Sequence, residues 1–172
     1  MTNFNQSTQE MIGYVGGGLR VETSTLANAT YLLTGGTATD CFNVYGRILV
    51  TQLYLEAITA FSAHATVLFF YYDASTPALA SNPMCAACAS VSGLGQGTRV
   101  VYVGGAVATA AVITDSAGLS DVTCVTPHIV GGHEFIGTIG VNSGTASQLS
   151  GTFRMIMHYL PYSDGAYAEA AL

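Results

Sequence analysis

The feature that most constrains this chain is the regular alternation of short β-rich runs with turn residues along nearly its whole length. Glycine pairs and Asp, Asn, Ser and Gly clusters separate the runs roughly every dozen residues. No run has the 3.6-residue spacing of apolar side chains that an amphipathic helix requires. The pattern predicts an all-β protein, an antiparallel β-sandwich of jelly-roll type. The expected strands cover residues 31–33, 41–45, 47–58, 67–72, 84–91, 98–103, 110–113, 121–125, 134–139 and 152–160.

Two of these runs alternate clearly enough to indicate a buried face. In the run 47–58, Leu49, Leu53 and Leu55 share one face, and polar groups such as Glu56 share the other. The last run alternates in the same way before Pro161 ends it. Its expected core face consists of Phe153, Met155, Met157 and Tyr159.

The chain of 172 residues has the length of one domain. Residues 1–18 are polar and then glycine-rich, so we expect a flexible N-terminal arm. Residues 19–160 form the predicted sandwich, and residues 161–172 form an extended tail that is rich in alanine and tyrosine. The expected anchors of the arm are its sizeable apolar side chains, Phe4, Met11 and Tyr14.

Charge is scarce, since 8% of the residues are charged whereas an average domain has about 25%. There is no lysine, the net charge is −6, and four scattered arginines cannot form the basic stripe that nucleic acid needs. A surface so poor in charge is expected to be covered by copies of itself or by a larger assembly. The alternative is a solvent face built from Thr, Ser, Asn, Gln and Gly.

Neither a membrane nor an export route is indicated by the sequence. The longest apolar run, residues 65–72, is far shorter than the ~18 residues of a spanning helix. The N-terminus lacks the positive and apolar regions of a secretory signal, so we expect the chain in the cytoplasm of the cell that makes it.

Four cysteines offer a candidate metal site. The pair Cys85 and Cys88, together with Cys124 and His128, provides the soft and imidazole ligands that zinc prefers. Within a strand, however, residues 85 and 88 would point their sulfur atoms to opposite faces. We therefore favour reduced, buried thiols and expect no cofactor. Calcium held by acidic turn residues stays open as an alternative.

Catalytic motifs are absent from the sequence. No serine lies in a G-x-S-x-G elbow, and His133-Glu134 has no second metalloprotease histidine. The glycines 93, 95 and 97 precede a predicted strand instead of a helix, so the dinucleotide fingerprint fails. We expect a protein with no catalytic residues, although a triad assembled by the fold cannot be read from sequence.

Three segments resemble a family of small virion proteins from tailed bacteriophages. They are residues 46–50 (GRILV) leading to Glu56, residues 84–86 (MCA), and residues 159–166 (YLPYSDGA) with the alanine-rich end that follows. The resemblance implies a capsid cement or decoration protein, a β-sandwich that binds the major capsid protein on the outside of the head and is often trimeric. It implies no catalytic residues. A second cysteine at 88, the polar arm and Glu169 depart from the family pattern.

On this reading the tail is a contact with a neighbouring subunit or the capsid, because uncharged side chains can be buried there without desolvating ions. The expected contact residues, besides the anchors of the arm, are Tyr159, Tyr162 and Tyr167. The alternative function is a receptor- or glycan-binding head of a phage fibre or spike, since sandwiches serve there too.

Overall fold

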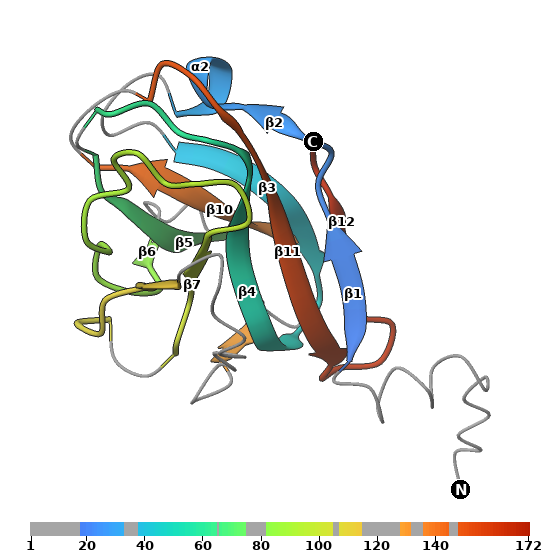
Figure 1. Cartoon of the computed structure of the whole chain (residues 1–172). Helices are drawn as coiled ribbons and strands as arrows, with labels where there is room; N and C mark the ends of the chain where they lie inside the picture. The colour runs from blue at the N-terminus through green and yellow to red at the C-terminus, as the bar shows by residue number, and fades with distance from the viewer. Residues whose placement is uncertain are drawn as a thin grey trace, which may run out of the picture.

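The computed structural model describes residues 18–32, 38–64, 66–74, 82–104, 107–114, 128–131, 136–144 and 148–172. These residues confirm the predicted all-β fold, because they form two antiparallel sheets (Figure 1). The helical structure among them is a single turn, α2 (Asn28–Tyr31). Within the described part of the chain, no helix is long and apolar enough to cross a membrane.

The first sheet has a central path of five strands in the order β1-β11-β4-β7-β8. Two short strands lie off this path. Strand β2 pairs with the start of β11, and β9 pairs with the start of β4. The two long strands β4 and β11 pair with each other inside this sheet (Figure 1). The strands are β1 (Leu19–Glu22), β2 (Leu26–Ala27), β4 (Ile48–Thr59), β7 (Arg99–Val101), β8 (Val112–Thr114), β9 (His128–Val130) and β11 (Thr152–Pro161).

The second sheet has five strands in the order β12-β3-β10-β5-β6. Its pairings are all antiparallel, and β10 lies between β3 and β5. Strand β12 follows β11 after a short turn, so the chain crosses from the first sheet to the second at this point. The strands are β3 (Ala38–Tyr45), β5 (Leu68–Ala74), β6 (Asn82–Pro83), β10 (Ile136–Ser143) and β12 (Tyr167–Ala170).

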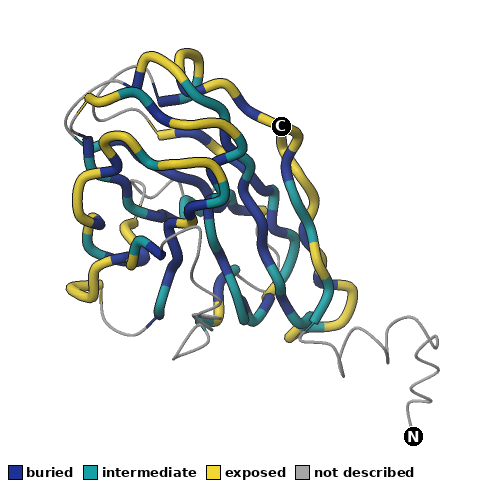
Figure 2. Tube along the Cα trace, in the orientation of Figure 1, coloured by how far each residue is buried: buried dark blue, intermediate teal, exposed yellow. Residues whose placement is uncertain are grey.

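The core lies between the two sheets, where the strands run dark blue in Figure 2. The alternation predicted for the last long strand is confirmed, since Phe153, Met155 and Met157 are fully buried. From the second sheet, Phe42 and Phe70 are fully buried in the same core cluster. Jelly-roll connectivity stays a prediction.

A β-bulge corrects the predicted buried face of β4. Leu53 and Leu55 are fully buried as expected, but Leu49 is only half-buried. The register with β11 shifts here, because His158 pairs with Gln52 and the next residue pairs with Val50. The extra residue reverses the alternation, so Val50 points into the core and Leu49 points outward.

Two other predicted strands differ in the structure. Residues 31–33 were expected to be extended, but Tyr31 ends the helical turn α2. Residues 84–91 were predicted as a strand, but they lie beside β5 as an irregular segment. The short strand β6 ends before them, at Pro83. The predicted strand 121–125 lies outside the described residues.

The C-terminal segment is part of the sandwich. Strand β12 pairs with β3, and Ala166 and Ala168 are buried against the core. On the opposite edge of β12, the Ala168 N–H donates to the Tyr159 hydroxyl at 3.0 Å. The end of the chain also bonds back to the fold, because the Ser24 N–H donates to the Leu172 carbonyl at 3.1 Å. Part of the predicted tail is therefore an edge strand whose outer side is already bonded within the chain.

Candidate functional site

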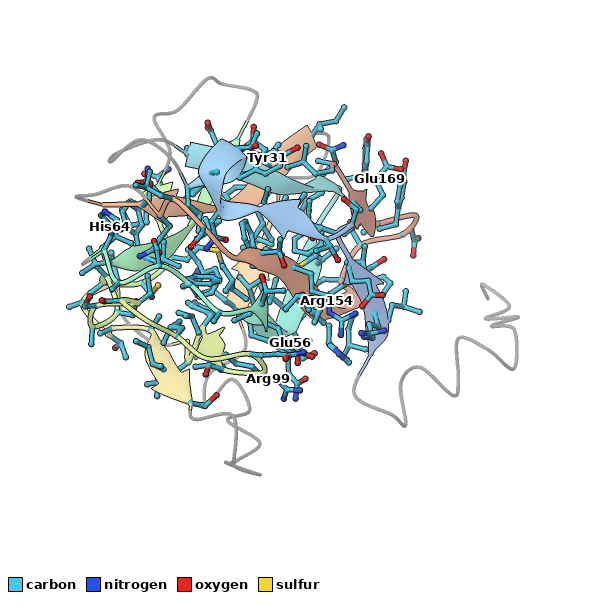
Figure 3. The ribbon with its side chains drawn as sticks, turned by 45° about the horizontal axis from the view of Figure 1, so that its top comes forward. Tyr31, Glu56, His64, Arg99, Arg154 and Glu169 are labelled. Carbon is cyan, nitrogen blue, oxygen red and sulfur yellow. The ribbon has the colours of Figure 1, made fainter. Side chains whose placement is uncertain are left out.

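The outer face of the first sheet carries a row of charges that crosses four neighbouring strands. We call it the charge ladder, and it consists of Arg20 and Glu22 on β1, Arg154 on β11, Glu56 on β4 and Arg99 on β7. The signs alternate along the row, so every member has an opposite charge beside it. Glu56, Arg99 and Arg154 lie together in Figure 3, whereas Glu169 lies apart from them on another part of the molecule.

Glu56 is the centre of the charge ladder. Its Oε2 accepts from Nε and the terminal Nη2 of Arg154 at 3.0 and 2.9 Å, and its Oε1 accepts from Arg99 at 3.4 Å. The hydrogen bonds that Arg154 donates to Glu56 are the main cause that raises the pKa of Arg154 above its ordinary value. Arg99 also lies over the ring of Tyr54 at 4.9 Å from its centroid. Three of the four arginines are thus engaged in intramolecular contacts on one face.

At one end of the sandwich, drawn at the bottom of Figure 1, two turns are bonded to each other. The Tyr162 N–H donates to the Arg47 carbonyl at 2.8 Å, and the Arg47 N–H donates to the Ser163 hydroxyl at 3.0 Å. Gly131 packs on the same turn with φ +95°, where a side chain would collide with the Gly46 carbonyl. These bonds fix the backbone of what we call the turn end.

Apolar side chains, some exposed and some half-buried, lie around the turn end in two cross-strand rows, one on the outer face of each sheet. On the second sheet, Tyr45 lies between its pairing partners Tyr167 and Ile136, which are 45% and 48% exposed. On the first sheet, Leu49 lies between Ile129 and Leu160. Tyr162 lies in the turn that joins the two sheets, and it is 60% exposed. We call these seven residues the turn-end rim: Tyr45, Leu49, Ile129, Ile136, Leu160, Tyr162 and Tyr167.

Two tyrosines of the rim are stacked and hydrogen-bonded. The rings of Tyr45 and Tyr167 have centroids 4.4 Å apart and planes inclined by 13°. The Tyr45 hydroxyl donates to Oε1 of Glu169 at 2.9 Å, and this bond raises the pKa of Tyr45. The stack is therefore a fixed surface feature with a carboxylate at one edge.

The rest of the outer face of the second sheet is also acidic. Asp40 Oδ1 accepts from the Tyr71 hydroxyl at 2.5 Å and from the Thr138 hydroxyl at 2.8 Å. Burial, and then the bond to Asp40, raise the pKa of Tyr71. Asp73 lies on the neighbouring strand opposite Thr138. Among the described residues this face holds carboxylates and no arginine.

The three predicted contact tyrosines have different positions. Tyr162 and Tyr167 are exposed members of the turn-end rim. Tyr159 is only 4% exposed, and its hydroxyl bonds the backbone of Ala168. Tyr159 therefore joins the two sheets and offers almost no surface to a neighbour. The predicted anchors of the arm, Phe4, Met11 and Tyr14, lie outside the described residues.

The described cysteines are buried free thiols, as predicted. Cys85 and Cys88 do not point to opposite faces, because their segment is not a strand. Their sulfur atoms accept from the N–H groups of Phe70 and Leu68 on β5, at 3.4 Å each. Burial raises the pKa of Cys85 to about 11 and that of Cys41 to about 12, so both favour the neutral thiol.

The four predicted zinc ligands are not seen as a cluster. Cys124 lies outside the described residues, and the ring of His128 packs edge-on against Tyr102 at 6.3 Å between centroids. Among the residues that the structure describes, no three His, Cys, Asp or Glu side chains are grouped so that they could hold a metal ion.

Sequence reasoning missed most of the turn-end rim. Leu49 was assigned to the core, and no role was given to Tyr45, Ile129 or Ile136. The sequence did hold a signal for Tyr45. This residue immediately precedes the turn at Gly46 and is therefore expected at an end of the sandwich. Its pairing with Tyr167 could not be found, because it requires the register of β12 on β3.

Comparison of the chain with protein-family models, with curated protein sequences and with solved structures finds no match.

Proposed function

We propose that this chain is a structural virion protein, a cement or decoration protein that binds the major capsid protein on the outside of a bacteriophage head. The observation that carries the proposal is the turn-end rim, an exposed apolar surface held on a hydrogen-bonded frame. Surfaces of this kind serve protein contacts, where aromatic side chains are enriched and charged ones are depleted.

The distribution of charge supports the same proposal. Three arginines are engaged in the charge ladder on the first sheet, so a contact at the turn-end rim would not have to desolvate them. The described cysteines are buried and protonated, which suits packing better than catalysis. The resemblance of residues 46–50, 84–86 and 159–166 to virion proteins supplies the capsid as the partner. A shell that repeats one contact many times gains strength through valency.

The experiment is a copy-number measurement on purified particles of the phage that encodes the chain. Quantitative mass spectrometry should find the chain in a fixed, high ratio to the major capsid protein, and particles that lack it should lose their genome at lower temperature. A matched set of particles carrying Leu149→Glu, an exposed residue far from the rim, should keep the ratio and the thermal stability. Particles free of the chain would overturn the proposal.

A second candidate is a receptor- or glycan-binding head of a fibre or spike. The Tyr45–Tyr167 stack with Glu169 at its edge favours it, because aromatic faces beside a carboxylate can bind a sugar ring. Here the chain would occur in a few copies at a vertex or tail tip. Labelling of particles with an antibody against the chain separates the two functions.

A further inference from the structure

Arg47 is the one arginine outside the charge ladder, and it lies at the turn end. Its backbone is bonded on both sides, to Tyr162 and to Ser163. The residue is exposed. No carboxylate of the described residues lies within ion-pair distance of its guanidinium, whereas the other three arginines all have such a partner. The turn end therefore presents a cation that the described fold leaves uncompensated.

Two carboxylates, Asp164 and Glu169, lie near the same end of the molecule. Asp164 is exposed in the turn that follows Tyr162. Glu169 is exposed on β12, where one of its oxygens accepts from Tyr45. No ion pair between described residues includes Asp164 or Glu169. The turn end thus carries apolar groups, one cation and two carboxylates, which makes it complementary to itself.

We infer that the turn-end rim is the contact between two copies of this chain, in which Arg47 of one copy lies against the Tyr45–Tyr167 stack and the Glu169 carboxylate of the other. A guanidinium over a tyrosine face and beside a carboxylate gains from both interactions. The second-sheet row of the rim and the neighbouring Tyr162 supply apolar area that such a contact buries, and the backbone of the turn end is already fixed, so little conformational entropy is lost on association.

A second copy fits this surface better than an added strand does. The outer edge of β12 is occupied within the chain, since the Ala168 N–H and carbonyl both bond the Tyr159 hydroxyl. Strand addition needs a free row of backbone groups at that edge. The contact is therefore made by side chains, and a second copy brings the cation that the acidic side of the rim lacks. This inference deepens the proposed function, on whose apolar surface it rests, by naming a second copy as the partner of the turn end.

The test is a charge exchange followed by sedimentation velocity at micromolar concentrations. The wild-type chain should be an oligomer. The single variants Arg47→Glu and Glu169→Arg should each weaken association by about tenfold or more, because each places like charges face to face. The double variant that carries both changes should associate again. Leu149→Glu, which alters an exposed apolar residue at the opposite end, should leave the mass unchanged.

Two outcomes would overturn the inference. One is a wild-type chain that sediments as a monomer at every concentration tested, and the other is a pair of single variants that associate as the wild type does. Circular dichroism on each variant excludes unfolding as the cause of a lower mass. Binding of the same samples to particles is measured separately. A monomer that still binds particles would overturn the contact between copies but not the proposed function.

Discussion

The charge ladder and the turn-end rim lie on the same sandwich but are built in opposite ways. On the ladder face, charged side chains lie outermost and cover an apolar one, since Ile156 points outward from β11 and yet is only 1% exposed. At the rim, Ile136 also points outward from its strand but is 48% exposed. On the ladder face the charges are paired and lie over an apolar side chain, whereas at the turn end apolar side chains are left exposed, and the comparison teaches that the two regions treat their outward-pointing apolar groups differently.

The largest effect should come from truncating the two isoleucines in parallel. Ile156→Ala removes buried methyl groups beneath the ladder and should lower the free energy of unfolding by about 2–5 kcal/mol. Ile136→Ala should change it by less than about 0.5 kcal/mol in the monomer, because its side chain is already half in water. Urea unfolding of both variants measures the difference. Equal losses would show that the two faces are covered alike.

A smaller effect is expected from the centre of the charge ladder. Glu56→Gln removes the carboxylate that two arginines share, and it should cost about 1–2 kcal/mol of unfolding free energy. The cost should shrink in about 1 M salt, where charges are screened within about 3 Å. Asp164→Asn, at an exposed carboxylate with no ion pair to a described residue, is the control and should show neither effect. A loss that salt does not alter would contradict an electrostatic origin.

The smallest effect concerns pH and the histidine next to the ladder. Burial, and then the charge of Arg20, lower the pKa of His158 below its ordinary value. The unfolded chain then binds this proton more readily than the folded one, so stability is fully present above about pH 6.5 and falls as the pH drops through and below that value. His158→Gln should flatten this part of the profile. Chemical unfolding between about pH 5.5 and 7.5 measures it, and an unchanged slope in the variant would refute the assignment.

The sequence predicts those parts of the fold that local pattern controls. The faces of β11 and the burial of Leu53 and Leu55 follow from alternation within one strand, and the structure has them as expected. The misassignment of Leu49 follows from a bulge against β11, a strand about a hundred residues later, which no local pattern encodes. The same limit applies to β12, whose alanines have little strand propensity and form a strand because their small side chains fit against the core.

The candidate site was predictable only where it coincides with the ends of the chain. Tyr162 and Tyr167 were found because they lie in the alanine- and tyrosine-rich segment that follows Pro161. Arg47 and Ile136 were not found, because their roles depend on neighbours that the fold brings close, Tyr162 for Arg47 and Tyr45 for Ile136. That Arg47 forms no ion pair with a described acid is a property of the folded surface, and only the ladder shows that the other arginines are already paired.

The hydrogen bonds between the Tyr159 hydroxyl and Ala168 of β12 form late in the synthesis of the described strands. Strand β3 emerges from the ribosome early, but the strand that covers its open edge is synthesised after every other described strand. Until Tyr167–Ala170 has been synthesised, the chain exposes the edge of β3, and the Tyr159 hydroxyl lacks its bonds to Ala168. An open strand edge can pair with another chain, and the pairing of β12 with β3 removes that edge.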